Sequence, residues 1–303
     1  AAEVNVTPDR GYCLSIRGIA REYSHATGKK FKDPASLWKP LTGQGFGLKV
    51  TDSAPIHGNP GCSGFALLAV EGIDAQAPTP AWMATRLKLA GMRSISIAVD
   101  ITNYVMLELG QPLHAYDLDK LNGGITVRRA KKGETIETLD GQTRKLDVED
   151  LVIADDASAI GIAGVMGGAS TEVSETTQNV LIEAANFDPV SIARSARRHK
   201  LPSEASKRFE RGVDVEIAAN AIARVVQLLE VHALGAGDSL GAHWRETAET
   251  KAIFLPADYA ESIVGVPFDA EETQKILAEI GCVTAVVDGG YEVIAPSWRP
   301  DIQ

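Results

Sequence analysis

The sequence predicts an α+β protein with a central, mixed and mostly antiparallel sheet, helices on its flanks and a smaller α+β unit at its end. The middle of the chain supports the sheet, because short stretches rich in β-branched residues alternate there with turn signals. The segments on either side support the helices, since their apolar residues recur at helical spacing. The 303 residues are enough for one large domain or two ordinary ones with a sizeable core.

Three helices are expected before the sheet. In each of them the apolar repeat ends at a glycine, which readily ends a helix. They cover residues 13–28, 77–91 and 100–109. Thr79 and Asp100 are the predicted N-caps of the second and third helices. Residues 29–64, rich in Gly, Pro, Ser and Asp, are expected to be irregular.

Five strand-like stretches follow. They cover residues 125–130, 135–146, 151–156, 159–168 and 179–187. Asp140-Gly141 predicts a two-residue hairpin turn inside the second stretch. Helices are then expected at 189–200 and 215–234. Residues 233–249, rich in Gly, Ala and polar residues, are interpreted as a linker.

The second domain is expected to cover residues 248–303, after a first domain of residues 1–247. Its helix, 269–281, has Asp269 as N-cap and ends at a glycine. A hairpin is expected around Asp288-Gly289-Gly290. The chain then ends in mid-pattern, so this domain is expected to be truncated.

Composition narrows the class of protein. Cys13, Cys62 and Cys282 are widely spaced and odd in number, which favours reduced thiols in the cytoplasm. No apolar run approaches the roughly 20 residues of a membrane span. A phosphate-binding loop, the common serine-hydrolase motif and paired zinc-ligating cysteines are absent from the sequence.

One basic stretch contrasts with the net charge of −10. Residues 194–212 contain eight basic or histidine residues among nineteen. The stretch is interpreted as a solvated helix face, with a nucleic-acid contact as the alternative.

Three groups of residues stand out chemically. Asn103 and His114 flank a Gly-Gln-Pro turn, and such a histidine is more often structural than catalytic. The glycine-rich residues 161–168 allow a close backbone approach, either by a ligand or by another strand. Glu183 is a carboxylate in an apolar stretch and needs an ionic partner or a ligand. From the residues alone, these alternatives stay open.

Several long motifs occur in order along the chain. They are VDITNYVMLELGQPLHAYDLDKL from Val99, TLDGQTRKL from Thr138, GIAGVMGG from Gly161, IEAANFDPVSIARSARRHKLPSEASKRFERGVD from Ile182 and PSWRPDI from Pro296. In these motifs the sequence resembles the β subunit of bacterial phenylalanyl-tRNA synthetase over nearly its whole length. The resemblance implies that residues 1–247 form the tRNA-editing domain, B3/B4, and that residues 248–303 form part of a winged-helix-like B5 domain.

The resemblance also implies an activity, the hydrolysis of tyrosine wrongly esterified to phenylalanine tRNA. Editing of this kind belongs to phenylalanine–tRNA ligase, which uses ATP and Mg²⁺ and combines α and β subunits in an α2β2 heterotetramer. The implied partners are therefore tRNA and the α subunit, without a membrane. The chain alone is expected to hold no cofactor and to be unable to aminoacylate.

Individual residues match positions of the family's editing site. Glu183 matches the carboxylate that reads the tyrosine hydroxyl. The implied catalytic residues, at the ester end, are His114, Asn103 and Thr102. The other implied substrate contacts are Ala163, Gly164, Arg93, Pro112, Ser203 and Ala205. Asp301 matches a carboxylate that helps to hold Mg²⁺ in the complete enzyme, and this position is expected to be empty here.

Water is the expected nucleophile, because no activated nucleophile is apparent in the sequence. His114 is expected to position the water or to steady the leaving ribose oxygen. Two other functions compete with editing. The chain is alternatively a non-catalytic module that docks tRNA or the α subunit, or a domain that binds a small molecule in the glycine-lined cavity.

Overall fold

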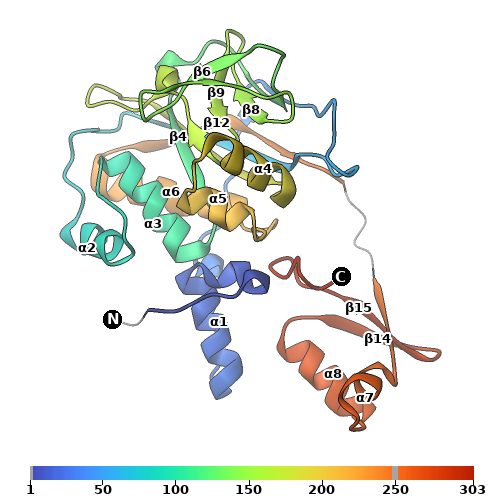
Figure 1. Cartoon of the computed structure of the whole chain (residues 1–303). Coiled ribbons are helices and arrows are strands. Elements are labelled where there is room, and N and C mark those ends of the chain that lie inside the picture. The colour runs from blue at the N-terminus through green and yellow to red at the C-terminus, as the bar shows by residue number, and fades with distance from the viewer. Residues whose placement is uncertain (1–2, 248–251) are drawn as a thin grey trace.

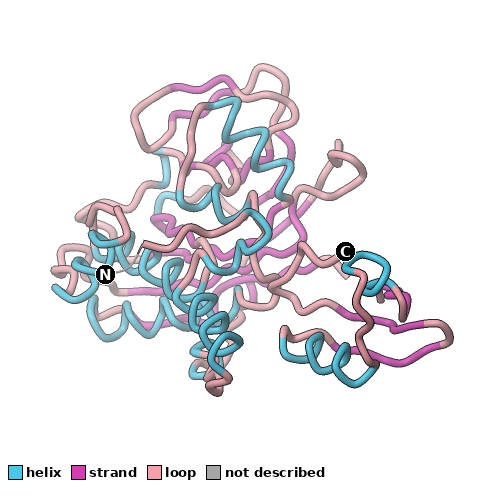
Figure 2. Tube along the Cα trace, turned by 60° about the horizontal axis from the view of Figure 1, so that its bottom comes forward, coloured by secondary structure: helices cyan, strands magenta, loops and turns pink. Residues whose placement is uncertain are grey.

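The computed structural model describes residues 3–247 and 252–303 (Figure 1). A larger body contains two five-stranded sheets with helices, and a smaller unit at the C-terminus lies beside it in both views (Figures 1 and 2). Among the described strands, β1 (Gln44–Gly45) pairs in parallel with β12 (Ala236–Arg245), and β2 (Leu48–Val50) pairs in parallel with β5 (Ile125–Arg129). The other ladders are antiparallel. The predicted α+β class with a mostly antiparallel sheet is confirmed.

The first sheet has the strand order β1-β12-β3-β11-β4. These strands are β1 (Gln44–Gly45), β12 (Ala236–Arg245), β3 (Cys62–Glu71), β11 (Val180–Phe187) and β4 (Leu113–Asp117). The central strands β3 and β11 are buried on both faces, so their sequences are continuously apolar instead of alternating. Glu183 interrupts the apolar run of β11.

The prediction of a linker over residues 233–249 is wrong for most of that segment, because β12 lies there and pairs with β3. Its glycines are needed for close packing. A Cβ atom on Gly241 would lie 2.2 Å from the Leu67 carbonyl oxygen and 2.9 Å from the Gly43 Cα atom. Residues 29–64 are likewise not wholly irregular, since they contain β1, β2 (Leu48–Val50) and the start of β3.

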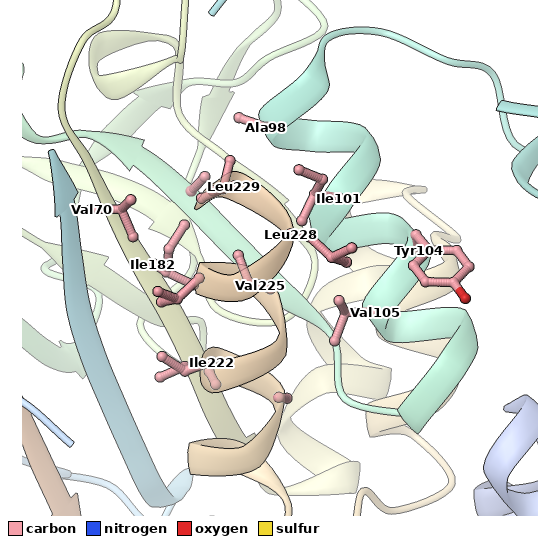
Figure 3. Close-up of a cluster of buried hydrophobic side chains, with 14 of the residues drawn as sticks. Val70, Ala98, Ile101, Tyr104, Val105, Ile182, Ile222, Val225, Leu228 and Leu229 are labelled. Carbon is pink, nitrogen blue, oxygen red and sulfur yellow. The ribbon is translucent and has the colours of Figure 1, made fainter. Parts of the chain in front are cut away.

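Helices α3 (Ile97–Leu109) and α6 (Ala218–Ala233) cover one face of the first sheet. Figure 3 shows Ile101 and Val105 of α3 facing α6, whose Val225 approaches Ile182 of the sheet. These side chains are almost fully buried, and each stabilises the fold by about 1.5–3 kcal/mol. This core holds β11 in place from the face opposite Glu183.

The expected helix ends are only partly correct. Helix α1 (Ile16–Thr27) ends at Gly28 as expected. Helix α2 (Ala81–Leu89) begins after Pro80, and the Thr79 hydroxyl donates to Asp100 instead of capping α2. Asp100 lies inside the first turn of α3, where its carboxylate accepts from the Ile95 amide at 2.9 Å. Both predicted N-caps are wrong, because the two side chains bind each other and the loop between the helices.

The second sheet has the order β10-β9-β8-β5-β2 and packs on the other face of the first sheet. Its remaining strands are β5 (Ile125–Arg129), β8 (Leu151–Ala154), β9 (Ala159–Ile162) and β10 (Met166–Gly167). The predicted stretch 159–168 is therefore two strands, separated by a turn at Ala163–Val165. Strands β6 (Thr135–Glu137) and β7 (Thr143–Lys145) form the expected hairpin. Its loop is longer than predicted, because the Thr138 amide donates to Gln142 across three residues.

The predicted helix at 189–200 is confirmed as α4 (Pro189–His199), and a short helix, α5 (Glu204–Phe209), follows it. Side chains of this basic stretch are bound within the protein. His199 contacts the Asp150 carboxylate at 2.7 Å, and Arg208 donates to the Leu14 carbonyl at 2.8 Å. These side chains therefore fasten α4 and α5 to the body.

The smaller unit has a three-stranded sheet in the order β13-β15-β14, with two helices. Its elements are β13 (Ile253–Pro256), α7 (Tyr259–Val264), α8 (Ala270–Glu279), β14 (Val283–Val287) and β15 (Gly290–Ile294). The Asp269 cap and the hairpin at 288–290 are as expected. The Arg21 guanidinium of α1 lies 3.7 Å from the Trp298 ring centre, which connects this unit to the body. The expected domain boundary at 247/248 adjoins residues 248–251, which lie outside the described residues.

The described residues also form four short 3-10 helices: Pro8–Cys13, Pro34–Leu37, Leu118–Lys120 and Ala169–Thr171. Within 3–247 and 252–303, no helix combines the length and apolarity needed to cross a bilayer.

Candidate active site

The site begins with the pairing of β4 and β11. Their antiparallel register places Glu183 directly opposite His114. Tyr116, two residues after His114, emerges on the same face of β4, because side chains alternate along a strand. Glu183, His114 and Tyr116 therefore share the face of the first sheet that looks toward the second sheet.

A cavity of about 90 Å³ lies between the two sheets at this point. One water needs roughly 10–15 Å³, so the cavity has room for several waters. Most of its wall is apolar. The lining residues come from β4 and the residue before it, β8, β9, β10, the turn between β9 and β10, β11 and α5: Pro112, Leu113, His114, Tyr116, Ile153, Gly161, Ile162, Ala163, Gly164, Val165, Met166, Gly167, Glu183, Phe187, Ala205 and Phe209.

Two glycines shape the cavity. Gly164 has φ +65°, and a Cβ atom there would lie 2.8 Å from the Phe209 ring. Gly167 lies so close to His114 that a Cβ atom would be 2.7 Å from its Cε1 atom. Bare backbone at these positions lets the β9–β10 turn approach α5 on one side and the imidazole on the other.

Glu183 is the buried acidic group of the cavity, with 7% of its surface exposed. Burial raises the pKa of this carboxyl group to about 7, because the charged form is poorly solvated there. The Tyr116 hydroxyl donates to Oε2, and this hydrogen bond acts in the opposite direction on the pKa. At neutral pH the carboxyl group is therefore poised between its neutral and ionised forms.

His114 is half-buried, and its ring meets the Tyr116 ring edge-on, with centres 4.5 Å apart and planes at 75°. Burial lowers the pKa of this imidazole to about 4. The ring is consequently neutral at pH 7, with one nitrogen able to donate a hydrogen bond and the other able to accept one.

Six of the residues expected at the site line the cavity: Pro112, His114, Ala163, Gly164, Glu183 and Ala205. Thr102 and Asn103 lie on α3 and are not among the lining residues, and the Thr102 hydroxyl donates to the Val99 carbonyl at 2.8 Å. Arg93 lines a separate surface groove, which Lys88 also lines.

Ser203 is also not among the lining residues, but its hydroxyl donates to the carbonyl oxygen of Val165, a lining residue, at 3.2 Å. The same hydroxyl also accepts from the Ser206 amide and so caps α5.

Asp301 does not fit a Mg²⁺ site in this structure. Both of its carboxylate oxygens accept hydrogen bonds from Arg299, at 2.7 and 2.8 Å. Across the described part of the chain, no three His, Cys, Asp or Glu side chains gather as metal ligands would. The expectation that this position holds no metal stays a prediction.

Sequence reasoning missed several wall residues: Tyr116, Met166, Phe187 and Phe209. The alternation in LHAYD carried a signal for Tyr116, because a strand at 113–117 places it on the same face as His114. The lining residues include no Ser, Thr, Cys or Lys, so the cavity wall supplies neither an alcohol nor a thiol as nucleophile.

Comparison with known families assigns a domain family to each of the two parts of the chain. The B3/4 domain family matches residues 61–233, which contain the whole cavity, and the tRNA synthetase B5 domain family matches residues 253–303. A crystal structure of an N-terminal fragment of the phenylalanyl-tRNA synthetase β subunit from Pyrococcus horikoshii matches 98% of this chain and 81% of its own. Its TM-score is 0.41 and its sequence identity 14%.

Relatives with much higher identity are β subunits of phenylalanine–tRNA ligase. The protein from Leifsonia xyli subsp. xyli is 61% identical over 100% of this chain and 36% of its own length. Those from Streptomyces avermitilis and Neisseria meningitidis serogroup B are 52% and 42% identical, over 99% of this chain and 36% and 38% of their own. The chain thus spans just over a third of the relatives it matches. It belongs to the family of phenylalanyl-tRNA synthetase β subunits, of which it carries the B3/4 and B5 domains.

Proposed function

We propose that the cavity is an editing site that hydrolyses the ester between tyrosine and phenylalanine tRNA. The observation that carries the proposal is Glu183, a buried carboxyl group that lines an otherwise apolar cavity. Such a group is well suited to receive one hydroxyl at the end of an apolar side chain. Tyrosine differs from phenylalanine by that hydroxyl alone.

Selectivity follows from the cost of an unpaired buried group. A tyrosine hydroxyl donates to ionised Glu183, whereas a phenylalanine ring excludes water from the carboxylate and offers no hydrogen bond. An unsatisfied buried polar group costs about 1–3 kcal/mol, and more when it is charged. This difference corresponds to roughly tenfold or greater preference for tyrosine, since 1.4 kcal/mol is a factor of ten.

Hydrolysis requires water to attack the ester carbonyl carbon. The bond from that carbon to the ribose oxygen then breaks, and the ribose oxygen takes a proton, which yields free tyrosine and deacylated tRNA. Neutral His114 can accept a hydrogen bond from the water or donate one to the ribose oxygen. The lack of Ser, Thr, Cys and Lys in the lining favours direct attack by water over a covalent intermediate.

The remaining parts of this proposal concern the rest of the ligase. We propose tRNA and the α subunit as partners, with ATP and Mg²⁺ serving aminoacylation elsewhere in the complete enzyme. We retain Thr102, Asn103, Arg93 and Ser203 as proposed contacts to the tRNA end or the ester, to be engaged when the substrate is bound. The expected location in the cytoplasm is proposed on the same grounds.

The direct test is deacylation by the purified chain of phenylalanine tRNA that carries either tyrosine or phenylalanine. We expect the tyrosyl ester to be hydrolysed and the phenylalanyl ester to be spared. Glu183→Ala should remove this preference, and His114→Ala should slow hydrolysis of the tyrosyl ester. Unchanged turnover in His114→Ala would rule out an essential role for the imidazole.

Two results would favour the other functions. Binding of tRNA or the α subunit without any deacylation would indicate a docking module. Binding of free tyrosine with no action on its tRNA ester would indicate a small-molecule site. Persistent discrimination in Glu183→Ala would refute the assignment of selectivity to this carboxyl group.

A further inference from the structure

Glu183 already has one phenol as a partner within the protein. The Tyr116 hydroxyl donates to Oε2, and both side chains are buried. The contact is possible because Tyr116 lies diagonally across the β4–β11 ladder from Glu183, within reach of an aromatic side chain. The cavity wall therefore contains the same pairing of phenol and carboxyl group that a tyrosyl ligand would make.

The second oxygen of the carboxyl group is in a different situation. Oε1 has no hydrogen-bond partner among the described residues. It is nevertheless not fully enclosed, since it does not belong to the buried side-chain atoms that lack a partner in the described part of the chain. Since Glu183 lines the cavity, Oε1 is the oxygen whose hydrogen-bonding capacity is left for a ligand there. One oxygen is thus held by the protein and the other is open.

We propose that Tyr116 is a specificity-determining positioning residue, which holds Oε2 of Glu183 so that Oε1 alone is presented to the hydroxyl of a phenolic ligand. This inference deepens the proposed function and rests on it for the identity of the ligand. Tyr116 acts through Glu183 and takes no part in breaking the ester bond.

The fixed hydrogen bond has two physical effects. It restricts rotation of the carboxyl group, so that Oε1 need not be oriented anew for each ligand. It also stabilises the ionised form, because the phenol donates to the charge that burial opposes. The ionised form is the one that penalises phenylalanine, so discrimination should increase as the pH rises through the pKa of Glu183.

Few other groups near Glu183 can produce that pH dependence. On β4, His114 has a pKa lowered to about 4, and the pKa of Tyr116 is raised well above its ordinary value. On β3, the pKa of the buried Cys62 thiol is also raised. The β9–β10 turn and α5 line the cavity with uncharged residues. A transition near pH 7 would therefore report on Glu183.

The test uses Tyr116→Phe in the 303-residue chain, with Tyr104→Phe as the matched control. Tyr104 is also a buried tyrosine whose hydroxyl donates to a glutamate, Glu108 at 3.0 Å, but it lies outside the cavity. Carbon-13 NMR of labelled glutamate carboxyl groups, assigned with Glu183→Gln, measures the pKa of Glu183 without any substrate. Deacylation of tyrosyl- and phenylalanyl-tRNA as a function of pH measures discrimination.

We expect Tyr116→Phe to raise the NMR midpoint of Glu183 by about one to two pH units, the equivalent of one hydrogen bond to a charged group. At pH 7, a one-unit rise lowers the ionised fraction, and with it the preference for tyrosine, about fivefold. The preference should recover at higher pH. Tyr104→Phe should change neither midpoint nor preference.

An unchanged NMR midpoint in a folded Tyr116→Phe variant would overturn the inference, whatever the enzymatic result. A raised midpoint with unchanged discrimination at every pH would also overturn it. Failure of the unmodified chain to deacylate tyrosyl-tRNA would instead refute the proposed function, and the NMR result would still decide whether Tyr116 holds Glu183.

Discussion

Replacing Gly164 by alanine would add one methyl group to the cavity wall, at a position where two separate penalties apply. The residue has φ +65°, a left-handed conformation that costs an L-residue about 1–2 kcal/mol. The new methyl carbon would also lie 2.8 Å from Phe209 Cδ2 and 3.1 Å from both Ile192 Cδ1 and Phe187 Cδ2. Overpacking of a filled core costs about 1–3 kcal/mol more.

The two penalties together predict a loss of about 2–5 kcal/mol in the free energy of unfolding. Gly133→Ala is the matched control, because Gly133 has φ +82° but no atom within 4 Å of an added Cβ. The Gly133→Ala variant should lose only the stability that corresponds to the conformational penalty, about 1–2 kcal/mol. In thermal unfolding, Tm should fall by roughly 4–20 °C for Gly164→Ala and by roughly 2–8 °C for the control, at about 2–4 °C per kcal/mol. Equal losses in the two variants would refute the inferred packing of this turn.

Two further predictions concern stability. The pKa of Glu183 is raised in the folded protein to about 7 from an ordinary 4.5, so its contribution to stability is complete at low pH and is lost as pH rises through that window. Relative to Glu183→Gln, the chain should lose about 3 kcal/mol between pH 4 and 8 in urea unfolding, and a constant difference would contradict the raised pKa. Arg17 donates to Asp33 and to the buried Asp214, at 2.7 and 2.8 Å. Arg17→Ala should cost about 3–5 kcal/mol because Asp214 loses its charged partner. Arg245→Ala, which removes an exposed ion pair, should cost at most about 1 kcal/mol, and similar costs for the two variants would show that burial is unimportant.

Local sequence signals predicted much of the fold, because they act over a few residues. Gly28 ends α1 and Asp269 caps α8 as expected. The errors occur where contact with a distant segment determines the local structure. Gly241 looked like a linker residue, whereas it is a glycine because the backbones of Leu67 and Gly43 approach it. Asp100 looked like a cap, but Thr79 and the Ile95 amide bind its side chain.

In the candidate site, too, local signals identified single residues, whereas contacts between distant segments could not be predicted. Glu183 and His114 were singled out as unusual residues in apolar surroundings, and the structure brings them to opposite positions of one ladder. The sequence could not supply the register between two strands about 70 residues apart. Nor could it reveal that Tyr116 binds Glu183, since that contact depends on the same register.

The position of β4 at the end of the first sheet affects access to the cavity. Strands β3 and β11 are each bonded to two neighbours, whereas β4 is bonded to β11 alone among the strands that the structure describes. Local opening of β4 would therefore break a single ladder, and the rest of the sheet would keep its hydrogen bonds. Of the two strands of this sheet that line the cavity, β4, which carries His114 and Tyr116, is accordingly the one that can yield to a bulky ligand while the other strands stay folded.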